Sequence, residues 1–224
     1  MKKRILSILL LCCMVLTLLP TTVSAADGPM DTIPKYDVSI DVYNRTSDIS
    51  IKDSRSYYIY SSVPDKLRDT WAWDKKIFIK GDKTAPHVFI DGVNIEMSPS
   101  SKGPAIELNK KASAYIYFIG KNSSLQGADG RAAIQKNRSE GQLYVLARTG
   151  TTVTCKGGDK AAGIGGSYAT RNISNGYYNG DMYGHGVNMH FGSQSNPDYW
   201  GGTIAAIGGN GGAGIGGGQG GSGE

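Results

Sequence analysis

An eleven-residue stretch that occurs twice constrains this sequence more than any other feature. Residues 156–166 read Lys-Gly-Gly-Asp-Lys-Ala-Ala-Gly-Ile-Gly-Gly, and residues 207–217 repeat most of them 51 positions later. A fainter copy lies 30 positions upstream, where residues 127–134 fall over residues 157–164, and residues 103–108 form a still fainter copy 28 positions before that. Self-similarity at such a nearly constant interval, with one longer spacing, predicts a solenoid that carries an insertion.

The first 25 residues have the composition of a secretory signal. Residues 1–4 include three basic side chains, residues 5–19 are apolar, and Val23-Ser24-Ala25 forms a small-residue cleavage site. We read the segment as a signal rather than a membrane span, because no stop-transfer pattern or second apolar run follows it. The sequence therefore predicts a secreted or cell-surface protein with no membrane span after signal removal.

Removing the signal changes the charge and the cysteine count. The mature chain keeps 21 Lys and Arg against 19 Asp and Glu, a net charge of about +2, which gives no support to nucleic-acid binding. It keeps a single cysteine, Cys155, so stability has to come from packing and backbone hydrogen bonds. Two interpretations of Cys155 stay open, a buried small apolar residue in a strand and a reactive thiol.

The order of segments along the chain predicts one solenoid with a cap. Residues 26–35 resemble a flexible leader, and residues 36–75 are interpreted as an N-terminal cap that covers the first apolar face. From residue 76 to residue 224, short β-branched and aromatic segments alternate with turn signals, and no amphipathic helix is evident. Residues 167–200 interrupt the repeat and are expected to project as a long loop.

The repeat interval has room for three short strands and three turns, which is typical of one coil of an all-β parallel β-helix. Ile106, Ile134, Ile164 and Ile215 are then expected to stack as an apolar ladder inside the coils. Residues 207–224 could alternatively form a flexible linker, since most of them are glycine, but their register with the earlier copy favours a coil. The chain is interpreted either as a truncated piece of a longer array or as ending in an open coil.

These segments resemble secreted, glycine-rich, right-handed parallel β-helix proteins of Gram-positive bacteria, often described as carbohydrate-binding-domain or pectate-lyase-like surface proteins. The resemblance covers residues 36–224 and is carried by short motifs: Val38-Ser-Ile40, Ile49-Ser-Ile51, residues 88–95, Ala105-Ile-Glu-Leu108, residues 125–130, Ala133-Ile-Gln135 and the two Gly-Ile-Gly-Gly blocks. It implies a right-handed solenoid and a surface protein without established catalysis, with polysaccharide binding the best-supported role.

The aromatic side chains of residues 167–200 are the candidate ligand site. Tyrosine and tryptophan faces stack on sugar rings while neighbouring amides and carboxylates bond the hydroxyls, although the same side chains could simply pack against the solenoid. The candidate residues are Tyr177, Tyr178, Tyr183, Tyr199 and Trp200. Trp71 and Trp73 offer two further rings in the cap.

Three aligned polar residues are the candidate metal site. Asp129, Asp159 and Asn210 fall at equivalent positions of three repeats, where their oxygens could bind Ca²⁺ or could bond backbone amides in a turn ladder. No spacing of acids, histidines or arginines singles out catalytic residues, so the sequence leans against an enzyme and predicts no required cofactor.

The function expected from the sequence is therefore that of a non-catalytic binding protein, with a polysaccharide or cell-wall glycan as the favoured ligand. The alternatives are a structural stalk or adhesin repeat and, after it, a Ca²⁺-dependent polysaccharide lyase. The chain is expected to be a monomer or part of a longer repeat array.

Overall fold

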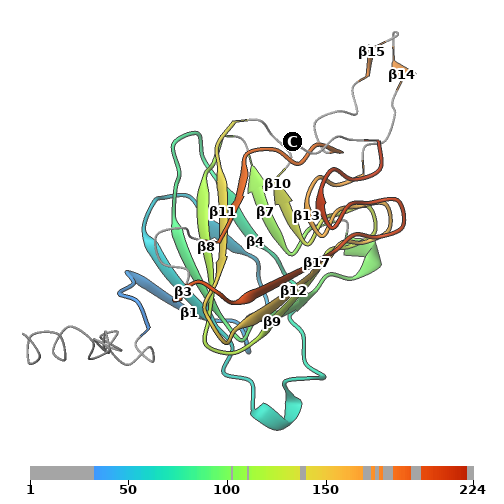
Figure 1. The fold of residues 1–224 in the computed structure, drawn as a ribbon. Coiled ribbons are helices and arrows are strands. Elements are labelled where there is room, and N and C mark those ends of the chain that lie inside the picture. The colour runs from blue at the N-terminus through green and yellow to red at the C-terminus, as the bar shows by residue number, and fades with distance from the viewer. Residues whose placement is uncertain are drawn as a thin grey trace, which may run out of the picture. The chain divides into compact units, whose positions relative to one another are not determined.

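The repeat predicted from the sequence folds into the coils of a parallel β-solenoid. In the computed structural model, the compact unit runs from Ile33 to Glu224. The residues that the structure describes are 33–101, 103–109, 111–136, 140–168, 173–174, 177–178, 184–192 and 198–220. Over these residues the parallel strands lie in three sheets, A, B and C, and from His87 onward the chain passes through them in the order A, C, B on each coil (Figure 1).

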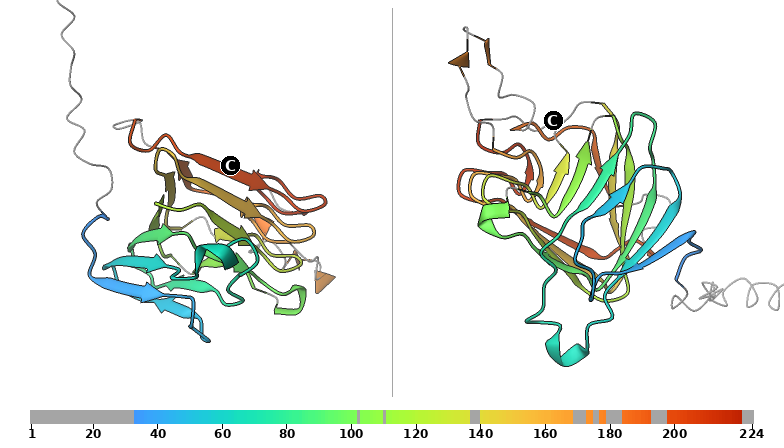
Figure 2. Two further views of the ribbon diagram at one scale, coloured as in Figure 1. Left: turned by 90° about the horizontal axis from the view of Figure 1, so that it is seen from below. Right: turned by 180° about the vertical axis from the view of Figure 1, so that it is seen from behind.

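Strands at equivalent positions of successive coils pair side by side, which Figure 2 shows in its left view as layers running from blue to red. Sheet A contains β1 (Val38–Asp41), β3 (Ser56–Tyr60), β5 (His87–Asp91), β8 (Ala114–Ile119), β11 (Leu143–Ala147) and β16 (Met189–Phe191). Sheet B contains β2 (Ile49–Ile51), β4 (Ile77–Lys80), β7 (Ile106–Asn109), β10 (Ile134–Lys136), β13 (Ile164–Gly165) and β18 (Ile215–Gly216). Sheet C contains β6 (Asn94–Glu96), β9 (Ser123–Gln126), β12 (Thr152–Lys156) and β17 (Thr203–Ile207).

Four short elements lie outside these sheets in the described part of the chain: η1 (Asp65–Leu67), η2 (Pro99–Ser101), and the antiparallel pair β14 (Ile173–Ser174) and β15 (Tyr177–Tyr178). The signal segment predicted at residues 1–25 lies outside the described residues. Within them, no helix combines the length and the apolar character needed to cross a bilayer.

The predicted isoleucine ladder is confirmed and is longer than expected. Backbone register places six isoleucines one above another in sheet B: Ile49, Ile77, Ile106, Ile134, Ile164 and Ile215. The first five are at most 2% exposed, whereas Ile215 on the last coil is 47% exposed. Burying each of these side chains contributes about 1.5–3 kcal/mol before the entropy of ordering is counted.

The N-terminal segment joins the same sheets. Between residues 36 and 75, β1 and β3 continue sheet A and β2 continues sheet B. Trp73 makes a parallel bridge with Ile95, so it occupies the sheet C position next to β6. The segment expected as a cap thus supplies backbone pairing to the first coils.

The predicted insertion is divided between two corners of the solenoid. Paired residues are 30 positions apart at Ile134 and Ile164, 46 apart at Leu143 and Met189, and 51 apart at Ile164 and Ile215. Most of the extra length therefore enters before β16, and only a small part follows it. The expected loop over residues 167–200 consequently contains β16, whose residues pair with β11 in sheet A.

Candidate functional site

The outer face of sheet A carries a column of stacked rings, which we call the aromatic ladder: His87, Tyr115, Tyr144 and His190. The ring centroids of neighbours lie 4.7, 4.6 and 4.5 Å apart, and the ring planes differ by 6°, 9° and 14°. Both faces of the two inner rings, Tyr115 and Tyr144, therefore contact neighbouring rings of the ladder. Since a sugar ring stacks on an open aromatic face, the ladder is suited to holding coils together rather than to binding a glycan.

A second aromatic row packs beside the ladder. Tyr58 and Phe89 are each 8% exposed, and the centroids of Phe89 and Tyr117 lie 4.9 Å apart. Burial, together with the hydrogen bond that the Tyr58 hydroxyl donates to Asp91 Oδ2 at 2.8 Å, raises the pKa of Tyr58. Trp200 meets Tyr117 at 5.1 Å and ends this row. The row is thus largely a packing surface.

Of the five aromatic residues predicted as a ligand site, the structure describes the side chains of Tyr199 and Trp200 only. Tyr177 and Tyr178 form β15, but the structure describes only their backbone, and Tyr183 lies outside the described residues. Tyr199 and Trp200 pack edge to face, with centroids 4.6 Å apart, and Trp200 lies against sheet A.

The two tryptophans of the expected cap have different environments. Trp73 is 3% exposed and donates a hydrogen bond from Nε1 to the carbonyl oxygen of Arg45 at 2.8 Å, so it belongs to the core. Trp71 is half-buried and meets Tyr43 edge to face. Of the two, only Trp71 offers indole surface to a ligand.

The three aligned polar residues do lie on successive coils. The backbone amide of Gly130 donates to the Asp159 carbonyl oxygen at 2.9 Å, and that of Lys160 donates to the Asn210 carbonyl oxygen at 3.1 Å. Asp129, Asp159 and Asn210 are all exposed at this corner. Among the described residues, no group of three or more His, Cys, Asp or Glu side chains could hold a metal ion.

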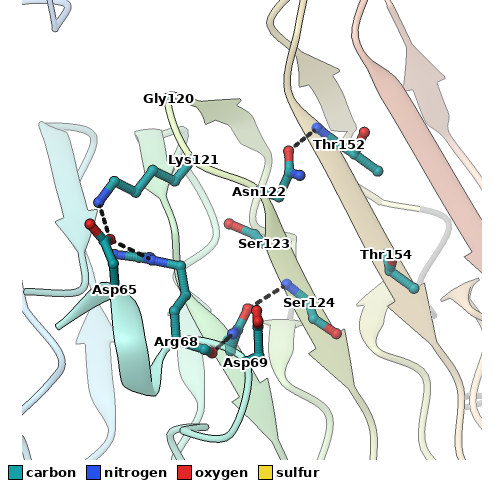
Figure 3. Close-up of a pocket in the computed structure, with 11 residues that line it drawn as sticks. Asp65, Arg68, Asp69, Gly120, Lys121, Asn122, Ser123, Ser124, Thr152 and Thr154 are labelled. Carbon is teal, nitrogen blue, oxygen red and sulfur yellow. Dashed lines mark hydrogen bonds and ion pairs between the residues drawn. The ribbon is translucent and has the colours of Figure 1, made fainter. Parts of the chain in front are cut away.

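A hollow lies on the outer face of sheet C, beside the loop that carries η1; we call it the sheet C groove. Its volume is about 650 Å³, within the range typical of small-ligand sites. Figure 3 shows its polar side chains, which come from the η1 loop on one side and from β9 and β12 on the other. The lining includes Asp65, Arg68, Asp69, Asn94, Ser124 and Thr154.

The wall of the groove is held in place by Arg68. Its Nη1 donates to the Gly92 carbonyl oxygen at 3.0 Å, and its own carbonyl oxygen accepts from Asn94 Nδ2 at 2.9 Å. Lys121 Nζ contacts Asp65 Oδ1 at 2.8 Å, which together with Arg68 lowers the pKa of Asp65 (Figure 3). Because these contacts span the loop and the sheet, the wall is positioned before any ligand arrives.

The floor of the groove is a row of polar side chains on adjacent strands. Asn94, Ser124 and Thr154 are aligned by parallel register across β6, β9 and β12, and their neighbours in sequence point into the core. Asn94 Oδ1 accepts a hydrogen bond from the Ser124 backbone amide at 3.1 Å, and this bond fixes the orientation of the Asn94 side-chain amide. Within the described part of the chain, the hydroxyls of Ser124 and Thr154 and the carboxylate of Asp69 have no hydrogen-bond partner.

A smaller hollow of about 150 Å³ adjoins the groove and brings in an aromatic ring. It shares Asp69, Asn94 and Ser124 with the groove and adds Trp71 and Gln126. Together the two hollows follow β9 and the turn that precedes it, from Gly120 to Gln126. The site thus combines an indole with hydroxyl, amide and carboxylate groups.

Sequence reasoning missed this groove. The available signal was the alternation of outward polar residues in residues 94–96, 122–126 and 152–154. What the sequence did not reveal is that residues 61–75 fold back against sheet C and turn one flat face into a hollow.

No protein-family model, no curated protein and no solved structure matches this chain. Its function therefore has to be inferred from its own geometry.

Proposed function

We propose that the chain is a secreted or surface-displayed, non-catalytic protein that binds a polysaccharide in the sheet C groove. The observation that carries this proposal is a group of hydroxyls on sheet C and a carboxylate on the facing loop, none of which has a hydrogen-bond partner among the described residues, next to the half-buried indole of Trp71. Such a surface can bond the hydroxyls of a sugar while the indole stacks on the apolar face of the ring. The resemblance to glycine-rich surface proteins of Gram-positive bacteria agrees with this role.

The groove is suited to a chain-like ligand. It is open, elongated along the strands, and walled on one side by a loop that Arg68 and Lys121 fix in position. Rigid polar groups lose little conformational entropy when a ligand binds, so even weak individual hydrogen bonds add to affinity. The near balance of acidic and basic side chains in the lining, Asp65 and Asp69 against Arg68 and Lys121, favours a neutral glycan in the groove.

Retention on a panel of insoluble and gel-embedded polysaccharides tests the proposal. The protein to use is residues 26–224, which contain the whole compact unit, with and without chelator. Trp71→Ala and Asp69→Asn are each expected to weaken binding about tenfold, by removing the stacking ring and a charge-assisted hydrogen bond. Thr154→Val should weaken it less, and Thr46→Val, on an exposed loop, is the matched control that should leave it unchanged.

Failure of the folded protein to bind any glycan would overturn the proposal. Binding that survives Trp71→Ala and Asp69→Asn would move the site elsewhere, and binding lost only with chelator would move it to the corner of Asp129, Asp159 and Asn210. Export itself is tested separately, by sequencing the N-terminus of the released protein for cleavage after Ala25.

A structural stalk is the second candidate function, and the aromatic ladder favours it. A column of stacked rings and a column of isoleucines run through successive coils, as a rigid spacer requires. The two functions are compatible, because the ladder occupies sheet A and the groove occupies sheet C.

A further inference from the structure

Among the described residues, the guanidinium of Arg148 is buried without a hydrogen-bond partner for its Nη2. Arg148 follows β11 at the corner between sheets A and C and is 8% exposed. Its Nη2 is fully buried and has no hydrogen-bond partner. In the described part of the chain, no hydrogen bond or ion pair reaches this side chain, and its one interaction partner is the ring of Tyr199, 5.4 Å from Cζ.

Such an arrangement is unfavourable for a protein on its own. Removing a charged group from water without pairing it costs several kcal/mol, so buried arginines are normally hydrogen-bonded to a carboxylate or to carbonyl oxygens. Arg68, which borders the sheet C groove, donates to the carbonyl oxygens of Gly92 and Val63, and only its Nε is left without a hydrogen-bond partner among the described residues. Arg148 differs from Arg68 because, among the described residues, none of its guanidinium nitrogens donates a hydrogen bond, and it therefore calls for an external partner.

Hydrogen bonds hold the residues next to Arg148 in place. The Thr149 amide donates to the Tyr199 carbonyl oxygen at 2.9 Å, the Thr149 hydroxyl donates to the carbonyl oxygen of Asp198, and the Gly201 amide donates back to Thr149 Oγ1 at 3.1 Å. These bonds fix residues 198–201 beside the arginine. The rings of Tyr199 and Trp200, both half-buried, are thereby held next to a guanidinium that has no anionic partner in the described part of the chain.

We propose that Arg148, Tyr199 and Trp200 form a second binding site that takes the carboxylate of an acidic sugar. The planar guanidinium pairs with a carboxylate through two parallel hydrogen bonds, and the adjacent indole contacts the sugar ring that bears it. This site shares no lining residue with the sheet C groove, so it goes beyond the function proposed above and can fail independently of it.

Two tetrasaccharides that differ only at C6 test the proposal. The first is β-1,4-linked tetraglucuronate, which carries carboxylates, and the second is cellotetraose, which carries hydroxymethyl groups. Titration of residues 26–224, followed by calorimetry and tryptophan fluorescence, should show that tetraglucuronate binds this site and that its affinity falls as salt rises. Arg148→Gln should lower that affinity about 10- to 100-fold, and Arg148→Lys should lower it less.

Two further variants keep the test decisive. Thr46→Val, on an exposed loop outside both sites, should leave tetraglucuronate binding unchanged, whereas Trp200→Ala should weaken it even if Arg148→Gln fails to fold. Because Arg148 is an unpaired buried charge, Arg148→Met is expected to raise the melting temperature of the free protein by a few degrees.

Three results would overturn the assignment. One is an absence of tetraglucuronate binding by the folded protein, and another is binding that Arg148→Gln and Trp200→Ala leave intact. The third is competition by citrate or acetate that is as effective as competition by the tetrasaccharide, because it would mean that the site takes any small carboxylate and does not recognise a sugar.

Discussion

Two side chains show how far the interior of the solenoid decides the chemistry of single residues. Cys155 stacks between Leu125 and Ala206 on the inner face of sheet C and is fully buried. Burial raises the pKa of its thiol to about 12, so the thiolate needed for reaction does not form at neutral pH. Of the two interpretations that the sequence left open, the buried apolar residue is therefore confirmed.

Lys136 is the residue from which we expect a clear pH dependence. It lies in β10 opposite Leu108, is 1% exposed, and donates from Nζ to the Glu140 carbonyl oxygen at 3.2 Å. Burial lowers its pKa from 10.5 to about 8, although Glu140 acts in the opposite direction. Between about pH 8 and pH 10.5 this lysine therefore holds more protons in the unfolded chain than in the folded one, and its contribution to the free energy of unfolding should rise with pH. Above about pH 9 the raised pKa of Cys155 acts in the opposite direction, so the contribution of Lys136 is read from the difference between the parent and a variant that lacks this lysine.

Replacement of this lysine by methionine should remove that dependence. Lys136→Met is expected to raise the free energy of unfolding at pH 7 by about 1–3 kcal/mol and to flatten its increase above pH 8. Urea unfolding at a series of pH values measures both effects, with Lys156→Met on the exposed side of β12 as the control. A variant less stable than the parent at pH 7 would show that the buried ammonium is net stabilising.

At the scale of the strands and turns, the glycines of the repeat are explained by the close approach of coils. A Cβ added to Gly158 would lie 1.9 Å from the carbonyl oxygen of Ala128 on the preceding coil. One added to Gly209 would lie 1.9 Å from the carbonyl oxygen of Gly158. Gly150, in contrast, has a φ of +84° but no atom within 4 Å of such a Cβ. One position thus needs glycine for space and the other for backbone conformation.

A pair of alanine substitutions separates these two requirements. Gly158→Ala should lower the free energy of unfolding by at least about 3 kcal/mol, because a backbone atom of a neighbouring coil cannot move aside easily. Gly150→Ala should cost only about 1–2 kcal/mol, the strain of an L-residue at positive φ. Denaturant unfolding compares the two variants, and equal losses would contradict a role for coil spacing.

The parts of the fold that the sequence predicted are those governed by local spacing. Ile134, Ile164 and Ile215 could be aligned because each coil must place an apolar residue at the same corner, and the glycines around them mark the turns. The division of the insertion could not be predicted, because one longer spacing between two copies does not say that Met189–Phe191 returns to sheet A. The groove depends on a contact between Arg68 and Gly92, 24 residues apart, which leaves no periodic signal.

The aromatic ladder is a second feature that could not be predicted from local spacing. The sequence pointed to Tyr199 and Trp200 because they cluster in the irregular segment, but it did not reveal that His87, Tyr115 and Tyr144 stack across three coils. Rings that are a whole coil apart in the sequence become neighbours only once the register of sheet A is known. A search at the repeat period, rather than for local clusters, would have found the ladder.

For the molecule as a whole, a solenoid in which each coil contacts its neighbours should lose structure from its ends. The ladder residue Ile134 is fully buried between two coils, whereas Ile215 is 47% exposed and β18 pairs on one side with β13. Ile134→Ala is therefore expected to lower the free energy of unfolding by about 2–5 kcal/mol, and Ile215→Ala by less than half as much.

Amide hydrogen exchange on the unmodified protein should show the same gradient. Amides of β17 and β18 are expected to exchange faster than those of β9, β10 and β12, which have paired strands on both sides. Uniform protection across all three sheets, together with equal losses for Ile134→Ala and Ile215→Ala, would mean that the last coil is covered in solution. The exposed side chains of Ile207 and Ile215 would then mark the contact surface, since they are 49% and 47% exposed in the isolated chain.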